Sequence, residues 1–231
     1  SRGLGDVYKR QELMKCVLEA AHSNVHATVG NLNNHIGVPL TLLAARTEPD
    51  IAIIEMGANA QKEIALLAEI AEPNAAVITN IGRAHLEGFG GEEGVIKGKG
   101  ELFDYIRNAR PESPVFTHGN HPKLLHLSEG LNRFIYGEPS SAPFVGEVHA
   151  EDIFAWVGPS GTSHGPFKVH VQGEHNRENI MTAIAIGLHY GVTETACTQA
   201  VATYQPDNNR SQWTSTPVSY THLRAHETEA Y

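Results

Sequence analysis

Residues 51–57, which read Ile-Ala-Ile-Ile-Glu-Met-Gly, decide the fold of this 231-residue chain. Four consecutive apolar residues end in a glutamate and a glycine, and a helical pattern follows at about 61–71. A second apolar run at 75–78 ends in Thr79 and Asn80. Apolar runs without polar alternation, separated by helices, are typical of parallel strands buried on both faces. The sequence therefore predicts an α/β fold with a mostly parallel, doubly wound sheet.

The α/β pattern continues on both sides of these runs. Gly98 and Gly100 fall inside one expected helix, although glycine disfavours helix interiors. The short strands expected after residue 114 indicate a small β-rich part. Apolar spacing predicts helices at 12–22, 39–45, 93–108, 176–190 and 194–204, and strands at 24–29, 134–136, 154–157 and 167–171.

Composition narrows the classes of function. The formal net charge of −9 argues against binding to bare nucleic acid or to an anionic membrane, which needs basic patches. An acidic protein can still bind a nucleotide when magnesium bridges the two. No apolar run approaches the roughly 20 residues of a membrane span. Cys16 and Cys197 form no metal or redox motif, so we expect a reducing compartment, the cytosol.

The segment 30–39, Gly-Asn-Leu-Asn-Asn-His-Ile-Gly-Val-Pro, carries three asparagines and two glycines between a short apolar run and a leucine-rich helix. Its amides at Asn31, Asn33 and Asn34 offer both donors and acceptors, and its glycines allow close backbone approach. These features fit a loop that grips a polar ligand. They fit a capped turn equally well, because Asn and Gly are common turn residues for local reasons.

Other candidate residues lie at or after the ends of the expected strands. In open parallel sheets the ligand crevice lies beyond the carboxyl ends of the strands. Glu55 ends one strand, and a carboxylate there can anchor magnesium or be a solvated or capping residue. His85 follows the next strand in a glycine-containing loop, where a structural histidine is the alternative. Lys97 and Lys99 could neutralise phosphate or form a solvated helix face.

Taken together, the motifs resemble the central domain of the Mur ligase family, a P-loop-NTPase-like fold. The resemblance covers about residues 12–213, and five motifs occur in the same order as in the family. They are GNLNNHIGVPLTLL at 30–43, IIEMGAN at 53–59, AHLEGFG at 84–90, KGKGE at 97–101 and GEHNREN at 173–179.

This resemblance implies an ATP-dependent, ADP-forming amide ligase of peptidoglycan synthesis. In the family a substrate carboxylate attacks the γ-phosphate of ATP, and an amine then displaces phosphate from the acyl phosphate. The doubled asparagine and the AHLEGFG loop resemble the branch that adds D-Ala-D-Ala to UDP-N-acetylmuramoyl-tripeptide. The implied cofactors are ATP and Mg²⁺, and the implied protein is a cytoplasmic monomer.

The resemblance also implies roles for individual residues. Glu55 matches the magnesium-binding glutamate, His85 the histidine of a second metal, and Lys99 a lysine that is carbamylated and so becomes a metal ligand. These three are the implied catalytic residues. The implied ATP-binding residues are Asn176, Asn179 and Arg210, and those facing the UDP-muramyl-peptide are Asn31, Asn33 and Asn34.

Two departures from the family concern the ends of the chain. Residues 1–11 and 218–231 resemble translated adapter or cloning sequence, so we expect a central domain at 12–205 and a linker with the start of a C-terminal domain at 206–217. The phosphate loop G-x-x-G-K-[ST] and the strand before it are expected upstream of Glu12 and do not occur. We therefore expect this chain to be inactive by itself. A smaller departure is Lys62, where the family pattern has glycine.

Three alternatives remain. Another ligase of the superfamily, such as the tripeptide-forming Mur ligase or folylpolyglutamate synthase, shares Glu55, His85 and Lys99 but lacks the doubled asparagine. A non-catalytic nucleotide-binding module is the second alternative, and the upstream gene sequence distinguishes it. A purely structural α/β domain leaves the Glu, His and Lys arrangement unexplained.

Overall fold

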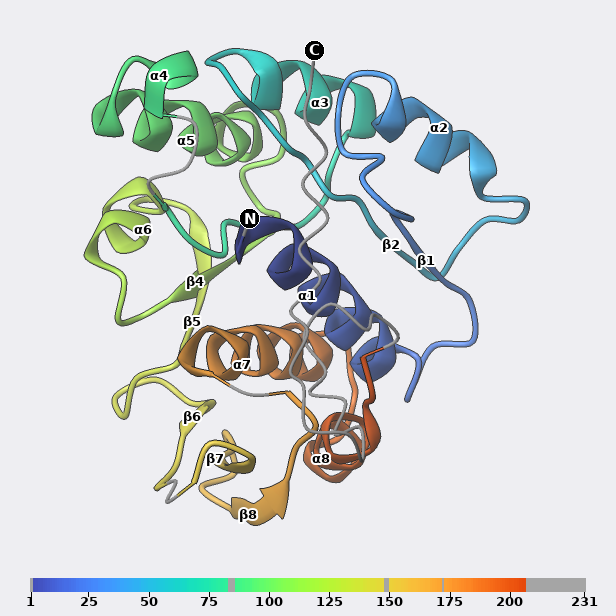
Figure 1. Ribbon diagram of the computed structural model, residues 1–231, viewed down its shortest axis with the longest axis vertical. Helices are drawn as coiled ribbons and strands as arrows, with labels where there is room; N and C mark the ends of the chain where they lie inside the picture. The colour runs from blue at the N-terminus through green and yellow to red at the C-terminus, as the bar shows by residue number, and fades with distance from the viewer. Residues whose placement is uncertain (1, 83–85, 148–149, 172, 207–231) are drawn as a thin grey trace, which may run out of the picture.

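The computed structural model describes residues 2–82, 86–147, 150–171 and 173–206 (Figure 1). Its parallel strands belong to two sheets, one of the order β1-β2 and one of the order β3-β4-β5. The predicted α/β class is confirmed, but the parallel strands divide between two sheets. These strands are β1 (Val25–Ala27), β2 (Ile51–Ile53), β3 (Ala76–Val77), β4 (Pro114–His118) and β5 (Asn132–Tyr136).

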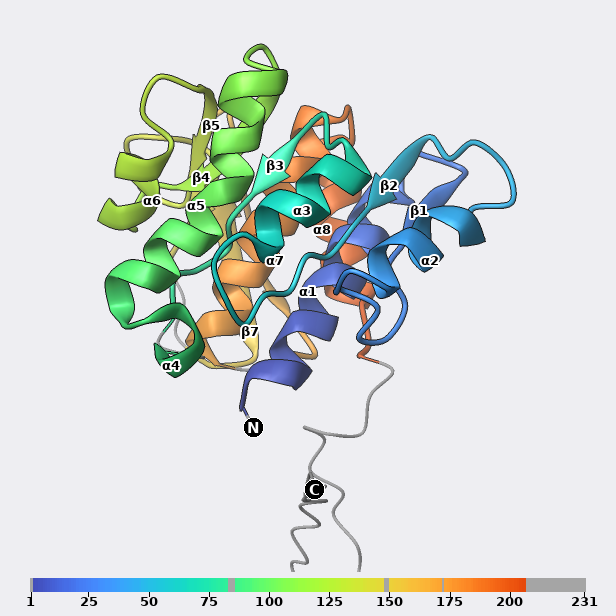
Figure 2. The same cartoon turned by 90° about the horizontal axis from the view of Figure 1, so that it is seen from above.

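Helices cover both faces of the parallel strands, giving three layers (Figures 1 and 2). Most of α7 is buried, and Ile180, Met181 and Ile184 have no exposed surface. On one face lie α1 (Arg2–Leu18), α7 (Glu174–His189) and α8 (Glu194–Thr203), and on the other α2 (Gly37–Ala44), α3 (Glu63–Ala71) and α5 (Glu92–Ala109). Two short helices, α4 (Leu86–Phe89) and α6 (Pro122–Leu127), lie beside α5 and β4.

Helix α1 is longer than the sequence predicts. It starts at Arg2 rather than at Glu12, so residues 2–11 belong to the helix and not outside the fold. The side chains of Lys9 and Gln11 are each only 7% exposed. Polar residues buried by contacts with distant parts of the chain leave no apolar periodicity, which is why the pattern did not reveal this half of the helix.

Two residues are unusual for their positions, a glycine inside a helix and a lysine with a positive φ. At Gly98, inside α5, an added Cβ would come within 2.4 Å of the Phe89 ring, so glycine permits α4 and α5 to approach. Lys62 precedes α3 with a φ of 72°, in the left-handed region that favours glycine. The substitution noted from the sequence therefore falls where the backbone is strained for a residue with a Cβ.

The β-rich part is an antiparallel sheet joined to α8. Its strands are β6 (Phe144–Val145), β7 (Ile153–Val157) and β8 (Ser163–Lys168). The Glu194 carboxylate of α8 accepts hydrogen bonds from Ser160 Oγ at 2.8 Å and Ser160 N at 3.1 Å, and it pairs with His164 Nε2 at 2.7 Å. The Trp156 indole stacks on the His164 ring, with centroids 4.5 Å apart. These contacts fix the hairpin to the helix.

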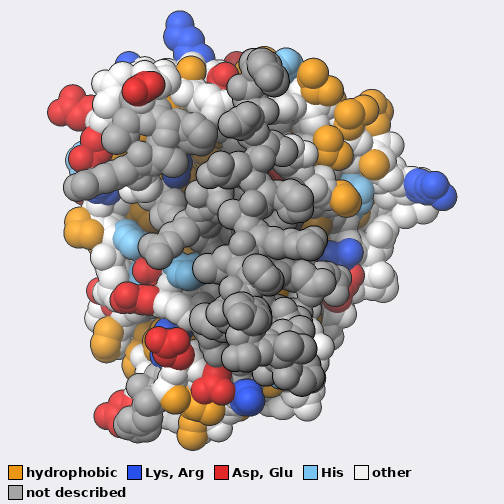
Figure 3. Space-filling model, viewed as in Figure 1, with side chains coloured by type: hydrophobic (Ala, Val, Ile, Leu, Met, Phe, Trp, Pro, Cys, Tyr) orange, Lys and Arg blue, Asp and Glu red, His pale blue; other side chains and the backbone are white. Residues whose placement is uncertain are grey.

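An apolar surface lies over α2 and its approach. Figure 3 shows hydrophobic side chains gathered at the upper right, where α2 lies in Figure 1. No helix within the described ranges is both long and apolar enough to cross a membrane. The exposed large hydrophobic residues are Val29, Ile36, Leu40, Leu43 and Leu66.

Candidate active site

A pocket lies between the two parallel sheets. Residues 48–59, which include β2 and its carboxyl end, form one wall, and residues 71–80, which include β3, form the other. Asn31, Asn33, Asn34 and Lys99 also line it. The structure therefore brings the asparagine loop, the glutamate and the lysine predicted from the sequence to one pocket.

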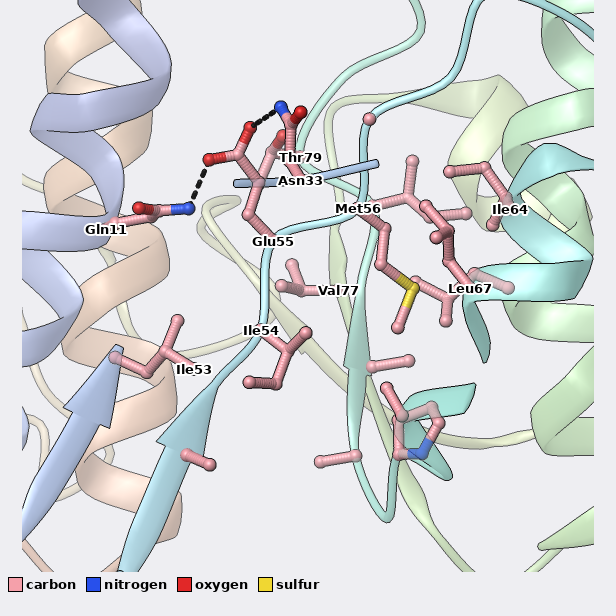
Figure 4. A pocket seen from close by; sticks show the side chains of 18 of the residues that line it. Gln11, Asn33, Ile53, Ile54, Glu55, Met56, Ile64, Leu67, Val77 and Thr79 are labelled. Carbon is pink, nitrogen blue, oxygen red and sulfur yellow. Dashed lines mark hydrogen bonds between the residues drawn. The ribbon is translucent and has the colours of Figure 1, made fainter. Parts of the chain in front are cut away.

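Glu55 stands at the carboxyl end of β2, where its carboxylate is held by two side-chain amides (Figure 4). Asn33 Nδ2 donates to one carboxylate oxygen at 2.6 Å, and Gln11 Nε2 donates to the other. Its backbone N–H donates to Thr28 Oγ1 at 2.9 Å. Burial raises the pKa of Glu55 above its ordinary value, and Asn33, the charge of Arg10 and Gln11 offset only part of this shift. The site thus holds a carboxylate whose charge is incompletely compensated.

The sequence left two interpretations of the asparagine loop open, a loop that binds a ligand and a capped turn. Asn33 reaches Glu55 and packs on Gly57, where an added Cβ would lie 2.7 Å from Asn33 Nδ2. The backbone carbonyl of Asn33 accepts a hydrogen bond from Gly57 N at 2.7 Å. Asn34 instead caps the turn into α2, because its Oδ1 accepts from Ile36 N at 3.0 Å and Gly37 N at 2.9 Å. The turn interpretation fits Asn34, whereas Asn33 lines the pocket and its predicted contact with a ligand stays a prediction.

Lys99 lies on α5 and reaches the end of β3. Its Nζ donates to the backbone carbonyl of Asn80 at 2.9 Å and to Asn80 Oδ1 at 3.4 Å. Burial and, secondly, the charge of Arg10 lower the pKa of Lys99. Lys97, two residues earlier, is exposed and does not line the pocket. The two lysines therefore separate into one pocket residue and one surface residue.

Asn176 and Asn179 lie in the first turns of α7, and both are buried. Asn179 Nδ2 donates to Asn176 Oδ1 at 3.4 Å, and Asn179 Oδ1 accepts from Arg10 Nε at 2.8 Å. Arg10 also donates to Thr79 Oγ1, at the end of β3. The two asparagines are thus outside the pocket lining but are joined to it through Arg10.

Sequence reasoning missed Arg10, Gln11 and Thr79 as members of this site. The first two were set aside with the N-terminal segment, and neither forms a motif. Thr79 carried a usable signal, because it is the first polar residue after an apolar run. His85 and Arg210 lie outside the described residues, so their predicted roles stay predictions.

Among the described residues, no three His, Cys, Asp or Glu side chains gather into a metal-binding group. Magnesium does not need such a group, since it is commonly bound through one or two carboxylates with substrate phosphates and water as its other ligands. Glu55, a partly buried carboxylate that faces a pocket and accepts hydrogen bonds from two neutral amides, fits that kind of site.

A three-layer α/β fold with a pocket and an acid at the carboxyl end of a parallel strand is typical of α/β proteins that bind a ligand in that crevice. Residues 11–187 match the Mur ligase middle domain, and the chain belongs to this family. It is 37% identical over 172 residues to the UDP-N-acetylmuramoyl-tripeptide--D-alanyl-D-alanine ligase of Bacillus subtilis, and 34% identical over 197 residues to that of Escherichia coli. These alignments cover 73% and 79% of this chain and 36% and 41% of the relatives.

The fold agrees with the solved structure of MurF from Acinetobacter baumannii, with a TM-score of 0.79 and 27% identity. That alignment covers 93% of this chain and 51% of the Acinetobacter chain. The chain thus spans about a third to a half of the length of the proteins it matches, and these matches confirm the family and fold predicted from the sequence.

Proposed function

We propose that the protein to which this chain belongs is an ATP-dependent ligase that joins D-Ala-D-Ala to UDP-N-acetylmuramoyl-tripeptide, as the named relatives do. The observation that carries this proposal is the partly buried Glu55 carboxylate at the carboxyl end of β2, in one pocket with Asn33 and Lys99. A relative with the same substrates in its name aligns along 73% of the chain. ATP, Mg²⁺ and a cytoplasmic location are part of the proposal.

In this reaction the tripeptide carboxylate attacks the γ-phosphate of ATP, forming an acyl phosphate and releasing ADP. The amine of D-Ala-D-Ala then attacks the acyl carbon, phosphate leaves, and the amine loses a proton. The tripeptide carboxylate and the triphosphate of ATP are both anions and must approach each other. The site therefore needs positive charge, and Glu55 is itself an acid. Bound magnesium supplies that charge and stabilises the charge that develops during phosphoryl transfer.

Glu55 is the residue we propose to hold the metal. Its two carboxylate oxygens accept hydrogen bonds from the amides of Gln11 and Asn33. These amides are neutral, so a metal can replace them at Glu55 without leaving either of them as an unpaired charge. Asn33 would then orient Glu55 or contact the muramyl-peptide, as would Asn31 and Asn34. His85 as ligand of a second metal and Arg210 as a nucleotide contact complete the proposed set.

Lys99 is proposed to act as a carbamate. Carbamylation requires a neutral amine, which attacks carbon dioxide and releases a proton. The lowered pKa of Lys99 favours this neutral form at a given pH. The product would be an anionic oxygen ligand beside Glu55. Asn176 and Asn179, already linked to the pocket through Arg10, are the proposed contacts of ATP.

The test is phosphate release by the full-length parent protein with UDP-N-acetylmuramoyl-tripeptide, D-Ala-D-Ala, ATP and magnesium. We expect release that requires every component and that Glu55→Ala or Lys99→Ala abolishes. Lys97→Ala is the matched control, because Lys97 is an exposed lysine of the same helix. Turnover with a different acceptor would retain the ligase family and refute the substrates. No turnover with any acceptor would favour the non-catalytic module.

The 231-residue chain alone is expected to release no phosphate. Its sequence contains no G-x-x-G-K-[ST] segment. In addition, Gln11 donates a hydrogen bond to the proposed metal ligand Glu55, and Arg10 donates one to the proposed ATP contact Asn179. Substrate-dependent ADP formation by this chain would contradict the expectation.

A further inference from the structure

The 54–62 segment, which contains Glu55, is held by contacts with other elements. It connects β2 to α3 without being part of a helix or strand. Near its first end, Gly57 N donates a hydrogen bond to the backbone carbonyl of Asn33 at 2.7 Å. Since no regular structure fixes this segment, the place of Glu55 in the pocket depends on what holds both of its ends.

Glu101 of α5 holds the second end. One of its carboxylate oxygens accepts a hydrogen bond from Lys62 N at 2.6 Å, and the other accepts one from Ala65 N at 3.0 Å. The first backbone N–H groups of a helix have no partner within the helix, and a negative charge beside them is favoured by the helix dipole. Within the described chain the side chain of Lys62, which precedes α3, makes no capping hydrogen bond. A carboxylate from a different helix takes this role.

The hydrogen bond to Glu101 is made at a strained residue. The φ of Lys62 is 72°, and a left-handed conformation of a residue with a Cβ persists where the surrounding structure holds it. The neighbouring Gln61 adds a second contact, because its Nε2 donates to the backbone carbonyl of Phe89 in α4 at 3.2 Å. The end of the 54–62 segment is therefore tied to α4 and α5.

Helix α5 carries both Glu101 and Lys99. Residues two apart in a helix point about 200° apart around its axis, and these two contact different strand ends. Lys99 Nζ donates to the backbone carbonyl of Asn80 at 2.9 Å, after β3, whereas Glu101 holds the segment after β2. Helices α3 and α5 lie side by side in both ribbon views (Figures 1 and 2). Helix α5 thus links the two walls of the pocket.

We propose that Glu101 is a positioning residue for the ligase reaction, because it holds the 54–62 segment against α5 and so sets the separation of Glu55 and Lys99. This role rests on the proposed function, in which Glu55 and the carbamate of Lys99 are metal ligands. Magnesium requires a near-ideal arrangement of its ligands, so a shift of either one weakens its binding. Glu101 is not one of the described residues that line the pocket, and it acts through the backbone that carries Glu55.

Amide hydrogen exchange in the 231-residue chain tests the contact without any catalysis. In Glu101→Ala, exchange should become about tenfold faster at Lys62 and Ala65, whose N–H groups lose their acceptors, and also at Gly57. A cap that stabilises only α3 would leave Gly57 unchanged, and that result would overturn the proposal. Asp104→Ala is the matched control, because Asp104 is an exposed acid of the same helix that pairs within that helix.

Two further variants separate positioning from a loss of overall stability. Glu194→Gln weakens the contact of α8 with the β7–β8 hairpin, so it shows what global destabilisation alone does to exchange at Gly57. An effect of Glu194→Gln on Gly57 as large as that of Glu101→Ala would refute the positioning role. If Glu101→Ala does not fold, Glu101→Gln takes its place, because it keeps one acceptor oxygen and should show the same order of effects.

The full-length parent protein tests the consequence for the metal site. Glu101→Ala should raise the Kd for Mn²⁺, followed by electron paramagnetic resonance, by about tenfold and lower kcat by about tenfold or more. Asp104→Ala and Glu194→Gln should stay within about twofold in both. An unchanged Kd in Glu101→Ala would overturn the proposal. If the unsubstituted protein binds no Mn²⁺, the metal site of the proposed function fails instead, and exchange at Gly57 decides whether Glu101 holds the segment.

Discussion

Glu55 and Glu194 are both partly buried carboxylates that accept hydrogen bonds through both oxygens, but their pKa values shift in opposite directions. Burial raises the pKa of both. At Glu55 the amides of Asn33 and Gln11 do not cancel that shift. At Glu194 the hydrogen bonds from His164 and Ser160 outweigh it and lower the pKa.

The difference separates a structural carboxylate, Glu194, from the carboxylate that we propose to be functional, Glu55. Glu194 meets hydroxyl, backbone and imidazole donors from the hairpin that it holds, so its ionised form stabilises the fold. At Glu55 burial outweighs the hydrogen bonds and raises the pKa, and the side chain faces a pocket. An acid with a raised pKa at the carboxyl end of a parallel strand, facing a pocket, is a candidate for a functional site.

The largest effect expected from this comparison is on activity. In the full-length parent protein, Glu55→Gln should lower substrate-dependent phosphate release by about 100-fold or more, since it removes a charge placed where the reaction needs it. Glu194→Gln, which keeps the same shape at the structural carboxylate, should stay within about twofold. Equal losses in the two variants would show that Glu55 acts only through stability.

Stability should show the reverse order. At pH 7, Glu194→Gln should lower the free energy of unfolding of this chain by about 1–2 kcal/mol, because charge-assisted hydrogen bonds to Ser160 and His164 are lost. Glu55→Gln should lower the free energy of unfolding less, or raise it, since it removes a partly buried charge whose pKa is raised by burial. Urea unfolding followed by circular dichroism measures both values. A greater loss for Glu55→Gln would refute the comparison.

The pH dependence should differ in sign. The pKa of Glu194 is lowered, so its contribution is present above the ordinary value of 4.5 and is lost as pH falls through its folded value. The pKa of Glu55 is raised, so its contribution is present below 4.5 and is lost as pH rises through its folded value. Urea unfolding of the wild type and of each Gln variant measures how the free energy of unfolding changes with pH. The range is pH 3.5 to 7, about one unit below and two and a half units above the ordinary pKa. Slopes of the same sign would contradict the assignment.

The smallest effect is expected at Gly57. Gly57→Ala would place a Cβ 2.7 Å from Asn33 Nδ2 and displace the amide that holds Glu55. Since that hydrogen bond lowers the pKa of Glu55, its loss should raise this pKa further, with a stability loss of at most about 1 kcal/mol. Carboxyl NMR titration follows the change. Gly82→Ala is the control, because the nearest atom to its added Cβ is 3.9 Å away, and an equal pKa change there would argue against the contact.

Much of this arrangement could be predicted from residue order. The apolar runs at 51–54 and 75–78 predicted parallel strands, and Glu55 was found because it ends one of them. The division into two sheets could not be predicted in this way, since an apolar run has the same pattern with one neighbouring strand or two. The ordinary sequence pattern also could not reveal the pair His164 and Glu194, which are 30 residues apart and form no motif.

Arg10 and Gln11 also carried no signal, and for a physical reason. Their partners are at the ends of β2 and β3 and in α7, and such contacts depend on how elements pack rather than on local preference. The resemblance to Mur ligases supplied the roles of Lys99, Asn176 and Asn179. The structure adds that Lys99 lines the pocket, whereas Asn176 and Asn179 lie outside its lining and Asn179 is linked to it through Arg10.

Helix α1 connects the two parallel sheets through two adjacent side chains. Its neighbouring residues Arg10 and Gln11 point about 100° apart around the helix axis, and each reaches the end of a different strand. Both contacts can form at one rotation of the helix only. In the described part of the chain no strand bridges β2 and β3, so α1, lying on one face, links the ends of the two strands through these two side chains.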